Sequence, residues 1–457
     1  MPARDILIKN GHVVTMDPAL GDIARADIHV GEGTIRQIGP DLPPAEDALV
    51  IDASGKVVLP GLVDTHRHVW QGAIGGSAGS VSLGGYFGVV IAGLAPQYDP
   101  DDVYAGTLWG ALQALNAGVT TVADWCHITT TPEHADANVE ALHDSGIRGV
   151  FLYGPPVAAG IVEWFVESTL PHPDDARRMR EEHFSSGRNG RLTMGLGLRG
   201  PELSTKETTK HDFDFARDLD LPISIHCGMA GYASRYRSVE TLRDLDLLGQ
   251  DINYAHGNLL TDHEFDLIAS SGGSISPCPS VDMLMGIGTY PATGRAVEHG
   301  VTTGISVDTV AGTGTDLFTE MRVALAAERS RTNAAAVSKD ESVAEVQLDQ
   351  RDMLRLATLE AATAWHLDAK IGSLAAGKQA DLIIVDTQRP HLHPLNDPVT
   401  TIVMNAGPSD VDTVIVEGEI VKSGGVLIGP HADRAFELVA ASNERLMAPA
   451  SVDAVPT

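Results

Sequence analysis

From residue 58 onward, short apolar runs alternate with amphipathic segments eight times, and this alternation limits the possible folds more than any other feature. The runs have the length and composition of buried strands, whereas the segments between them follow helical periodicity. The predicted strands are 58–66, 119–124, 149–153, 192–198, 222–226, 252–256, 274–276 and 302–307. The predicted helices are 101–117, 134–144, 208–219, 261–271 and 315–330. Eight such alternations predict an α/β fold, a TIM-type (β/α)8 barrel.

Both ends of the chain show a different pattern, in which short strands are separated by turns. Residues 1–57 alternate apolar runs with turn signals such as Asn10-Gly11. After a helical pattern at 350–366, short strands return, and a tail helix is expected at about 431–446. We therefore expect a barrel domain over 58–370. Beside it we expect a small β-sandwich domain built from both chain ends, 1–57 and 371–457.

Charge and composition exclude several classes of protein. The 457 residues include 61 acidic and 32 basic side chains, a net charge of −29, which repels phosphate backbones and anionic lipid. The start of the chain, MPARDILIKN, lacks the apolar core of a secretory signal, and the apolar stretch 83–96 is too short to span a bilayer. Three cysteines are too few for a disulfide framework. We expect a cytoplasmic protein with a small-molecule substrate and no nucleic-acid or membrane partner.

Side chains that can bind a metal lie at the ends of four predicted strands. His66 and His68 end the first strand, and their spacing of two places both imidazoles on the same side. His226, His256 and Asp308 end the fifth, sixth and eighth strands. One histidine at a strand end is usually only a polar cap. A set of five at the face where barrel enzymes carry their active sites indicates a metal-dependent enzyme.

Several motifs extend this pattern over nearly the whole chain. They are 59–68 (LPGLVDTHRH), 118–122 (GVTTV), His226, His256, 306–308 (SVD) and the 372–382 segment with its Ala380-Asp381-Leu382 end. In this order they resemble the amidohydrolase superfamily, and most closely the branch of triazine hydrolases, guanine and adenosine-type deaminases and cytosine deaminase. The resemblance implies that His66, His68, His226 and Asp308 bind one divalent metal, with His256 beside the metal-activated water.

The chemistry explains these residue types. Three neutral imidazoles and a carboxylate suit Zn²⁺, with Fe²⁺ or Co²⁺ as alternatives, and such an ion lowers the pKa of a bound water to about 7. Asp308 is placed to move a proton from that water to the leaving group, and His256 to orient the water or polarise the substrate. Binuclear relatives use a modified lysine at a middle strand. The third and fourth strands end at Tyr153 and Arg199 without a lysine, which favours one metal per subunit.

Two departures from the ring deaminases of this branch affect the expected reaction. Their strand-five histidine is followed three residues later by a glutamate that protonates the ring, whereas this chain has Met229. A general acid contributes about 10²–10⁴-fold in rate. The seventh strand is followed by Val281 and Asp282 instead of a Ser-Asn pair. These changes favour hydrolysis of a non-peptide C–N bond of the amide, urea or carbamate type, including phenylurea or thiocarbamate xenobiotics.

Two alternatives stay open. One is a heteroaromatic ring aminohydrolase or chlorohydrolase of the triazine or nucleobase type that uses the same metal. The other is a non-catalytic assembly protein with the same fold. Proteins of that kind usually lose metal ligands, whereas every matched ligand position is filled here.

Further residues are candidates for substrate binding, and each has a simpler explanation. The candidates are Gln71, Trp125, His127, Arg199 and Met229. A loop glutamine is often solvated, an aromatic residue at a barrel mouth often only packs, and an arginine often pairs with a nearby aspartate. The long segment 72–100 is rich in glycine and carries Tyr86, Phe87 and several aliphatic residues. Its length predicts a lid, and its apolar content favours either an apolar substrate or a subunit contact in a homo-oligomer.

Overall fold

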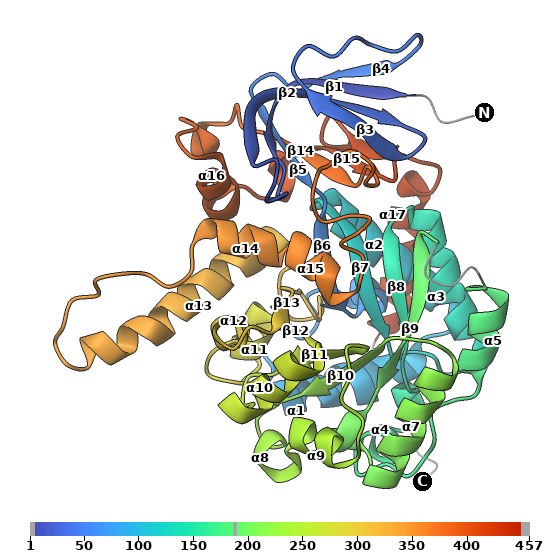
Figure 1. Cartoon of the computed structure of the whole chain (residues 1–457). Coiled ribbons are helices and arrows are strands. Elements are labelled where there is room, and N and C mark those ends of the chain that lie inside the picture. Colours follow the sequence, from blue (N-terminus) through green and yellow to red (C-terminus); the bar gives the residue numbers. More distant parts are fainter. Residues whose placement is uncertain (1–4, 186–189, 449–457) are drawn as a thin grey trace.

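The barrel contains eight parallel strands that neighbour one another in sequence order (Figure 1). This computed structural model describes residues 5–185 and 190–448. The strands are β6 (Leu62–Arg67), β7 (Val119–Cys126), β8 (Arg148–Tyr153), β9 (Leu192–Leu198), β10 (Ile223–Cys227), β11 (Ile252–His256), β12 (Ser274–Ser276) and β13 (Thr302–Thr303). A parallel bridge between Arg67 and Asp308 connects the segment after β13 to β6. The predicted TIM-type barrel is confirmed.

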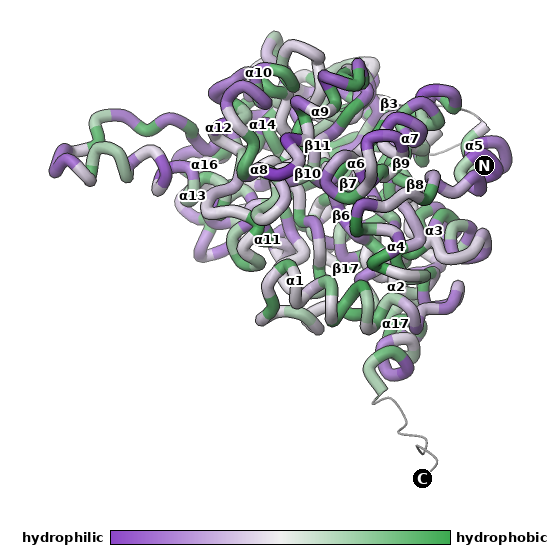
Figure 2. The backbone as a smooth tube through the Cα atoms, turned by 90° about the horizontal axis from the view of Figure 1, so that it is seen from below, coloured by the Kyte–Doolittle hydropathy of each residue, from purple (hydrophilic) through white to green (hydrophobic). Residues whose placement is uncertain are grey.

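Helices surround these strands, as Figure 2 shows from the side of the barrel away from the second domain. Those between β6 and β9 are η1 (Val69–Ile74), α1 (Leu83–Tyr86), η2 (Phe87–Leu94), η3 (Ala95–Gln97), α2 (Pro100–Asn116), α3 (Pro132–Ser145), η4 (Val157–Ala159), α4 (Ile161–Phe165) and α5 (Asp175–Glu182). Later helices are α6 (Gly200–Leu203), α7 (Lys206–Asp218), α8 (Ala233–Tyr236), α9 (Ser238–Asp244), α10 (Asp262–Ser271), α11 (Pro279–Leu284), α12 (Thr293–Glu298), α13 (Leu317–Val337), α14 (Gln350–Leu356) and α15 (Leu359–Ala364). The five predicted helices correspond to α2, α3, α7, α10 and α13. The long α13 projects from the barrel in Figure 1.

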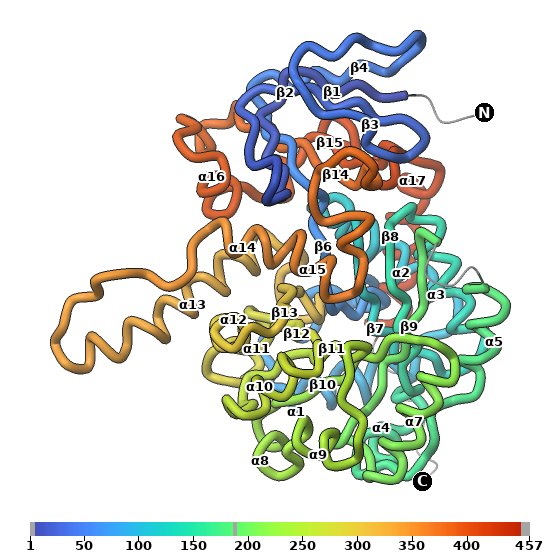
Figure 3. The backbone as a smooth tube through the Cα atoms, viewed as in Figure 1, coloured from blue at the N-terminus to red at the C-terminus, as the bar shows by residue number. Residues whose placement is uncertain are grey.

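The second domain is a nine-stranded sheet that both chain ends build, as expected (Figure 3). Its strands are β1 (Ile6–Val14), β2 (Asp22–Gly31), β3 (Thr34–Gly39), β4 (Leu49–Asp52), β5 (Lys56–Pro60), β14 (Leu382–Asp386), β15 (Val411–Val416), β16 (Glu419–Ser423) and β17 (Val426–Leu427). β5 joins the two halves, because it pairs with β1 on one side and with β14 on the other. Apolar residues of β1, β2, β3, β5, β14 and β15 form one buried cluster, the core of this sandwich domain. The remaining elements are η6 (Pro390–Leu392), α16 (Pro398–Asn405), η7 (Pro408–Asp410) and the tail helix α17 (Ala432–Leu446).

The strand expected at 58–66 is divided at Gly61. Residues up to Pro60 belong to β5 in the sandwich sheet, so that sheet extends three residues past the expected boundary at residue 57. Gly61 marks the crossing between the domains. A Cβ there would lie 2.1 Å from the hydroxyl oxygen of Thr120, so only glycine fits. The eighth strand is also shorter than expected, because regular pairing ends at Thr303.

A buried ion pair shows which end of the barrel faces the sandwich domain. The guanidinium of Arg148, the first residue of β8, makes two hydrogen bonds of 2.8 and 3.1 Å to the carboxylate of Asp381. Asp381 directly precedes β14. The amino ends of the strands therefore face the sandwich, and their carboxyl ends open on the opposite side. No helix in the described ranges is long and apolar enough to cross a membrane.

Candidate active site

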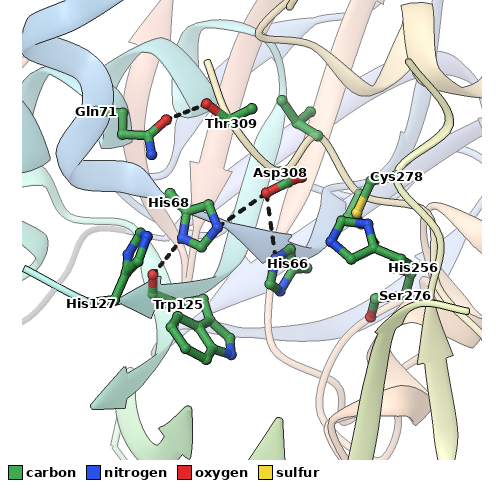
Figure 4. Close-up of polar contacts among 12 residues, drawn as sticks. His66, His68, Gln71, Trp125, His127, His256, Ser276, Cys278, Asp308 and Thr309 are labelled. Atoms are coloured by element: carbon green, nitrogen blue, oxygen red, sulfur yellow. Dashed lines mark hydrogen bonds and ion pairs between the residues drawn. The ribbon is translucent and has the colours of Figure 1, made fainter. Parts of the chain in front are cut away.

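The five side chains expected at the strand ends lie close together, and Figure 4 shows four of them, His66, His68, His256 and Asp308. His66 and His68 come from β6 and its end, His226 from β10, His256 from β11 and Asp308 from the segment after β13. The Nε2 atoms of His66 and His68 lie 3.5 and 3.1 Å from Asp308 Oδ1. The ligand atoms of His66, His226 and His256 also lie within 4.8 Å of one another. The structure therefore brings the five predicted side chains together at the carboxyl ends of the barrel strands.

A hydrogen bond to the backbone orients one of the candidate ligands, His68. The Nδ1 of His68 lies 2.7 Å from the backbone oxygen of Trp125, and a proton held there turns Nε2 toward Asp308. His256 and Asp308 both have positive φ, 70° and 65°, which is uncommon for residues other than glycine. Such strained backbone at two converging strand ends is typical of functional sites.

The electrostatics of these groups suit a divalent cation. Burial lowers the pKa of His66 to about 4 and the pKa of His226 well below its usual range, so both imidazoles are neutral. Burial alone would raise the pKa of Asp308, but contacts with His66 and His68 hold it well below its usual range. Neither ring nitrogen of the buried His66 has a hydrogen-bond partner among the described residues. Neutral imidazole nitrogens without partners beside an ionised carboxylate fit a borderline metal such as Zn²⁺.

Asp282 positions His256, a contact that the sequence did not reveal. Its Oδ1 lies 2.9 Å from His256 Nδ1, and its Oδ2 accepts a 3.1 Å hydrogen bond from the backbone N–H of Cys278. Burial opposes protonation of His256, but the hydrogen bond and charge of Asp282 outweigh burial and raise its pKa. The only available signal was the place of Asp282 after the seventh strand. The direction in which the Asp282 side chain points depends on how α11 folds, which the sequence alone does not show.

Glu202 is a second buried carboxyl group that sequence reasoning missed. It accepts hydrogen bonds from the backbone N–H of Gly228, at 2.7 Å, and from the hydroxyl of Ser238, at 3.0 Å. Burial raises its pKa to about 7. Glu202 does not line the active-site cavity. Its hydrogen bond from the backbone N–H of Gly228 supports the turn that leads to Met229.

A largely apolar cavity lies over the candidate metal ligands. Besides His68, His226, His256 and Asp308, its lining consists of Leu83, Tyr86, Phe87, His127, Phe165, Leu203, Met229, Val281, Met285, Ile287 and Thr309. The cavity measures about 40 Å³. The 72–100 segment contributes Leu83, Tyr86 and Phe87. That segment therefore forms part of the cavity wall.

The candidate substrate-binding residues occupy three kinds of position. His127 and Met229 line the cavity. Trp125 is fully buried beneath the ligands, with its ring centroid 4.5 Å from that of His226. Arg199 is also fully buried, paired with Asp212 at 2.5 Å, and does not reach the cavity. Gln71 does not line the cavity itself, but its side-chain amide contacts two residues that do, Tyr86 and Thr309.

Comparison with known proteins agrees with this geometry. The model of the amidohydrolase family matches residues 57–421. The chain belongs to the amidohydrolase family. This amidohydrolase is 30% identical over 425 residues to a 5'-deoxyadenosine deaminase of Methanosarcina mazei, covering 91% of this chain and 92% of that protein. It is 28% identical over 441 residues to a 5-methylthioadenosine/S-adenosylhomocysteine deaminase of Pyrococcus furiosus, covering 94% and 98%.

Solved structures share the whole fold of this amidohydrolase. An adenosine deaminase from Xanthomonas campestris with bound zinc superimposes with a TM-score of 0.82 at 22% identity, covering 98% of this chain and 99% of that one. A zinc complex of atrazine chlorohydrolase from Arthrobacter aurescens gives 0.83 at 22% identity, covering 96% and 100%. The relatives match the triazine hydrolase and deaminase branch that the motifs indicated. The chain is thus a metal-dependent hydrolase of non-peptide carbon–nitrogen bonds.

Proposed function

We propose that this amidohydrolase is an aminohydrolase, which replaces an amino group on a small heteroaromatic ring by oxygen from water and releases ammonia. The observation that carries the proposal is the complete set of converging histidines and aspartate in a chain that is 30% identical to a deaminase over 91% of its length. This proposal reverses the preference that Met229 and the Val281-Asp282 pair suggested. The deaminase relatives support the ring reaction more strongly than hydrolysis of a phenylurea or thiocarbamate.

In this proposal His66, His68, His226 and Asp308 hold one divalent metal, with Zn²⁺ favoured. When bound, the metal supplies a Lewis acid that lowers the pKa of water to about 7. Asp308 Oδ1 lies beside the imidazoles at 3.1–3.5 Å, where its carboxylate can take a proton from the attacking water and pass it to the departing amine. His256, held by Asp282, donates a hydrogen bond to the oxygen that adds to the ring.

The cavity lining argues for a substrate without a sugar, unlike the nucleosides named for the deaminase relatives. Several ribose hydroxyls would need polar partners, because an unpaired buried hydroxyl costs about 1–3 kcal/mol. In the described part of the chain Asp308 is the only carboxylate that lines the cavity, and it belongs to the metal site. Most other lining residues are aliphatic or aromatic. A planar, largely apolar aminated heterocycle fits these walls.

A second candidate is hydrolysis of an amide, urea or carbamate C–N bond. Met229 favours it, because this residue lines the cavity at the position where ring deaminases carry a proton-donating glutamate. An acyl carbon is already electrophilic and depends less on such an acid. The same metal site would serve both reactions.

Product analysis separates the two candidates. Zinc-loaded protein is incubated with aminated pyrimidines, purines and triazines, and in parallel with phenylureas, carbamates and anilides, with Asp308→Asn as the blank. Release of ammonia with a ring product about 1 Da heavier, absent from the blank, is the expected result. Cleavage of a urea or amide into two fragments would establish the second candidate instead. Turnover of adenosine at the rate of the free base would contradict the argument against a sugar.

A further inference from the structure

Few polar groups face the cavity beyond the metal ligands and His256. In the described ranges they are Tyr86, His127 and Thr309. His127 is already engaged, since its Nδ1 lies 3.3 Å from the indole nitrogen of Trp70 and its ring packs against His68 at a centroid distance of 4.3 Å. Tyr86 lies at the end of α1, in the segment that covers the site. Its hydroxyl is therefore the polar group that the 72–100 segment brings to the cavity.

A chain of hydrogen bonds fixes the direction of the Tyr86 hydroxyl. The backbone N–H of Ala311 donates to Thr309 Oγ1 at 3.2 Å, so the hydroxyl of Thr309 donates in turn to Gln71 Oε1 (Figure 4). With its oxygen facing Thr309, the amide of Gln71 points Nε2 at Tyr86, and it donates to the phenol oxygen at 2.6 Å. A phenol oxygen that accepts this bond keeps its own proton for another acceptor.

Burial keeps the phenol protonated. Tyr86 is only 6% exposed. Burial raises its pKa, and the nearby charge of Asp308 raises it further. At neutral pH Tyr86 is thus a hydrogen-bond donor at the metal site, and its support runs through Gln71 to Thr309, the residue next to Asp308.

We propose that Tyr86 donates a hydrogen bond to a ring nitrogen or ring oxygen of the substrate, and that Gln71 and Thr309 position it for this role. This inference rests on the proposed ring hydrolysis. Attack on a ring carbon places negative charge on the neighbouring heteroatom, and Met229 offers no proton to it. A donor held in a dry cavity stabilises that charge more than the ground state. Tyr86 would thereby perform part of the task of the missing glutamate and would select substrates with an acceptor beside the attacked carbon.

Turnover of an accepted aminated heterocycle tests this role. Tyr86→Phe should lower kcat by about 10²-fold, the usual loss on removing one such donor, with a small change in KM and an unchanged zinc content. Tyr98→Phe is the matched control, because it removes another buried phenol hydroxyl, which has no hydrogen-bond partner within residues 5–185 and 190–448 and lies outside the cavity lining. Gln71→Leu should lose a similar factor, and the double variant Gln71→Leu/Tyr86→Phe little more than either single one. A Tyr86→Phe enzyme with kcat within threefold of the parent would overturn the proposal.

A binding measurement keeps the test independent of turnover. The probe is pyrimidine, a planar ring with nitrogen acceptors and no amino group, titrated into zinc-loaded protein. Tyr86→Phe should weaken its binding by about threefold to tenfold and shift a ring-stretching infrared band of the bound ring toward its frequency without a hydrogen bond, whereas Tyr98→Phe should do neither. If the band moves in His127→Gln and not in Tyr86→Phe, the donor is His127 and the proposal is wrong. Failure of every aminated ring as a substrate, with this band shift intact, would refute the proposed reaction and leave the role of Tyr86 in binding.

Discussion

Replacing Glu320 by glutamine should make the stability of the protein less sensitive to a rise in pH between 4.5 and about 8. Glu320 lies on α13, is 1% exposed and accepts a 2.8 Å hydrogen bond from the backbone N–H of Ser280, which precedes Asp282 by two residues. Burial raises its pKa from the ordinary 4.5 to about 8, against the hydrogen bonds of Ser280 and with the help of Asp64 and Asp316. Glutamine keeps an oxygen for the Ser280 bond and carries no charge.

The sign and size of the effect follow from proton linkage. Between pH 4.5 and about 8 the folded protein keeps the Glu320 proton that the unfolded chain releases. The stability that this protonation contributes is complete below pH 4.5 and is lost as the pH rises through about 8. A tenfold difference in proton affinity between the folded and unfolded chain corresponds to about 1.4 kcal/mol. The difference between a pKa of 4.5 and a pKa of about 8 therefore limits the loss of unfolding free energy to about 5 kcal/mol. Glu320→Gln removes this loss.

Urea unfolding of parent and Glu320→Gln at pH 5, 6, 7 and 8 tests the reasoning, with equal zinc in every sample. The difference in unfolding free energy, variant minus parent, should grow steadily with pH. Glu437→Gln on the exposed face of α17 is the matched control and should show no trend. A difference for Glu320→Gln that is flat from pH 5 to 8 would mean that the carboxyl is ionised in the folded protein, contrary to the argument.

Three further predictions concern the site and the domain contact. Asp282→Asn removes the charge that holds His256 and should lower kcat by about 10²-fold or more without changing the zinc content. Steady-state kinetics and metal analysis measure both quantities, and an unchanged kcat would exclude this positioning role. Removing metal with a chelator should abolish activity and lower the thermal midpoint, and one equivalent of Zn²⁺ per chain should restore both; a requirement for two would refute the single-metal site. Arg148→Met leaves the Asp381 carboxylate buried without its partner and should destabilise the protein by about 3–5 kcal/mol in urea unfolding, part of which the double variant Arg148→Met/Asp381→Leu should regain. A loss below about 1 kcal/mol for the single variant would contradict the importance of this contact.

The parts of the structure that depend on local pattern could be predicted from the sequence. The helix over 261–271 follows from Thr261 and Glu264, whose reciprocal capping bonds are present at the start of α10. The meeting of the candidate metal ligands follows from parallel topology, since any residue that ends a barrel strand must lie at the same face. The division of 58–66 between two sheets could not be predicted, because the close approach of Thr120 to Gly61 is a contact between distant segments.

The outer parts of the site depend on the directions of side chains, which strand ends do not determine. Trp125 and Arg199 lie at the right ends of the right strands, yet one packs beneath the ligands and the other pairs with Asp212. Asp282 and Tyr86 lie in short helices whose placement depends on packing around the cavity. Residues of this kind are recognised only once the folded loops bring them to the metal site.

The position of β5 between β1 and β14 has a consequence for synthesis on the ribosome. β5 ends at Pro60, whereas its partner β14 begins at Leu382. At about 5–20 residues per second, translation of the intervening chain takes on the order of half a minute. During that time the apolar residues Val57, Val58 and Leu59 form an unpaired strand edge, which is prone to join other nascent chains. The nascent protein therefore needs a chaperone or an early-folding barrel to shelter this edge until its last fifth emerges.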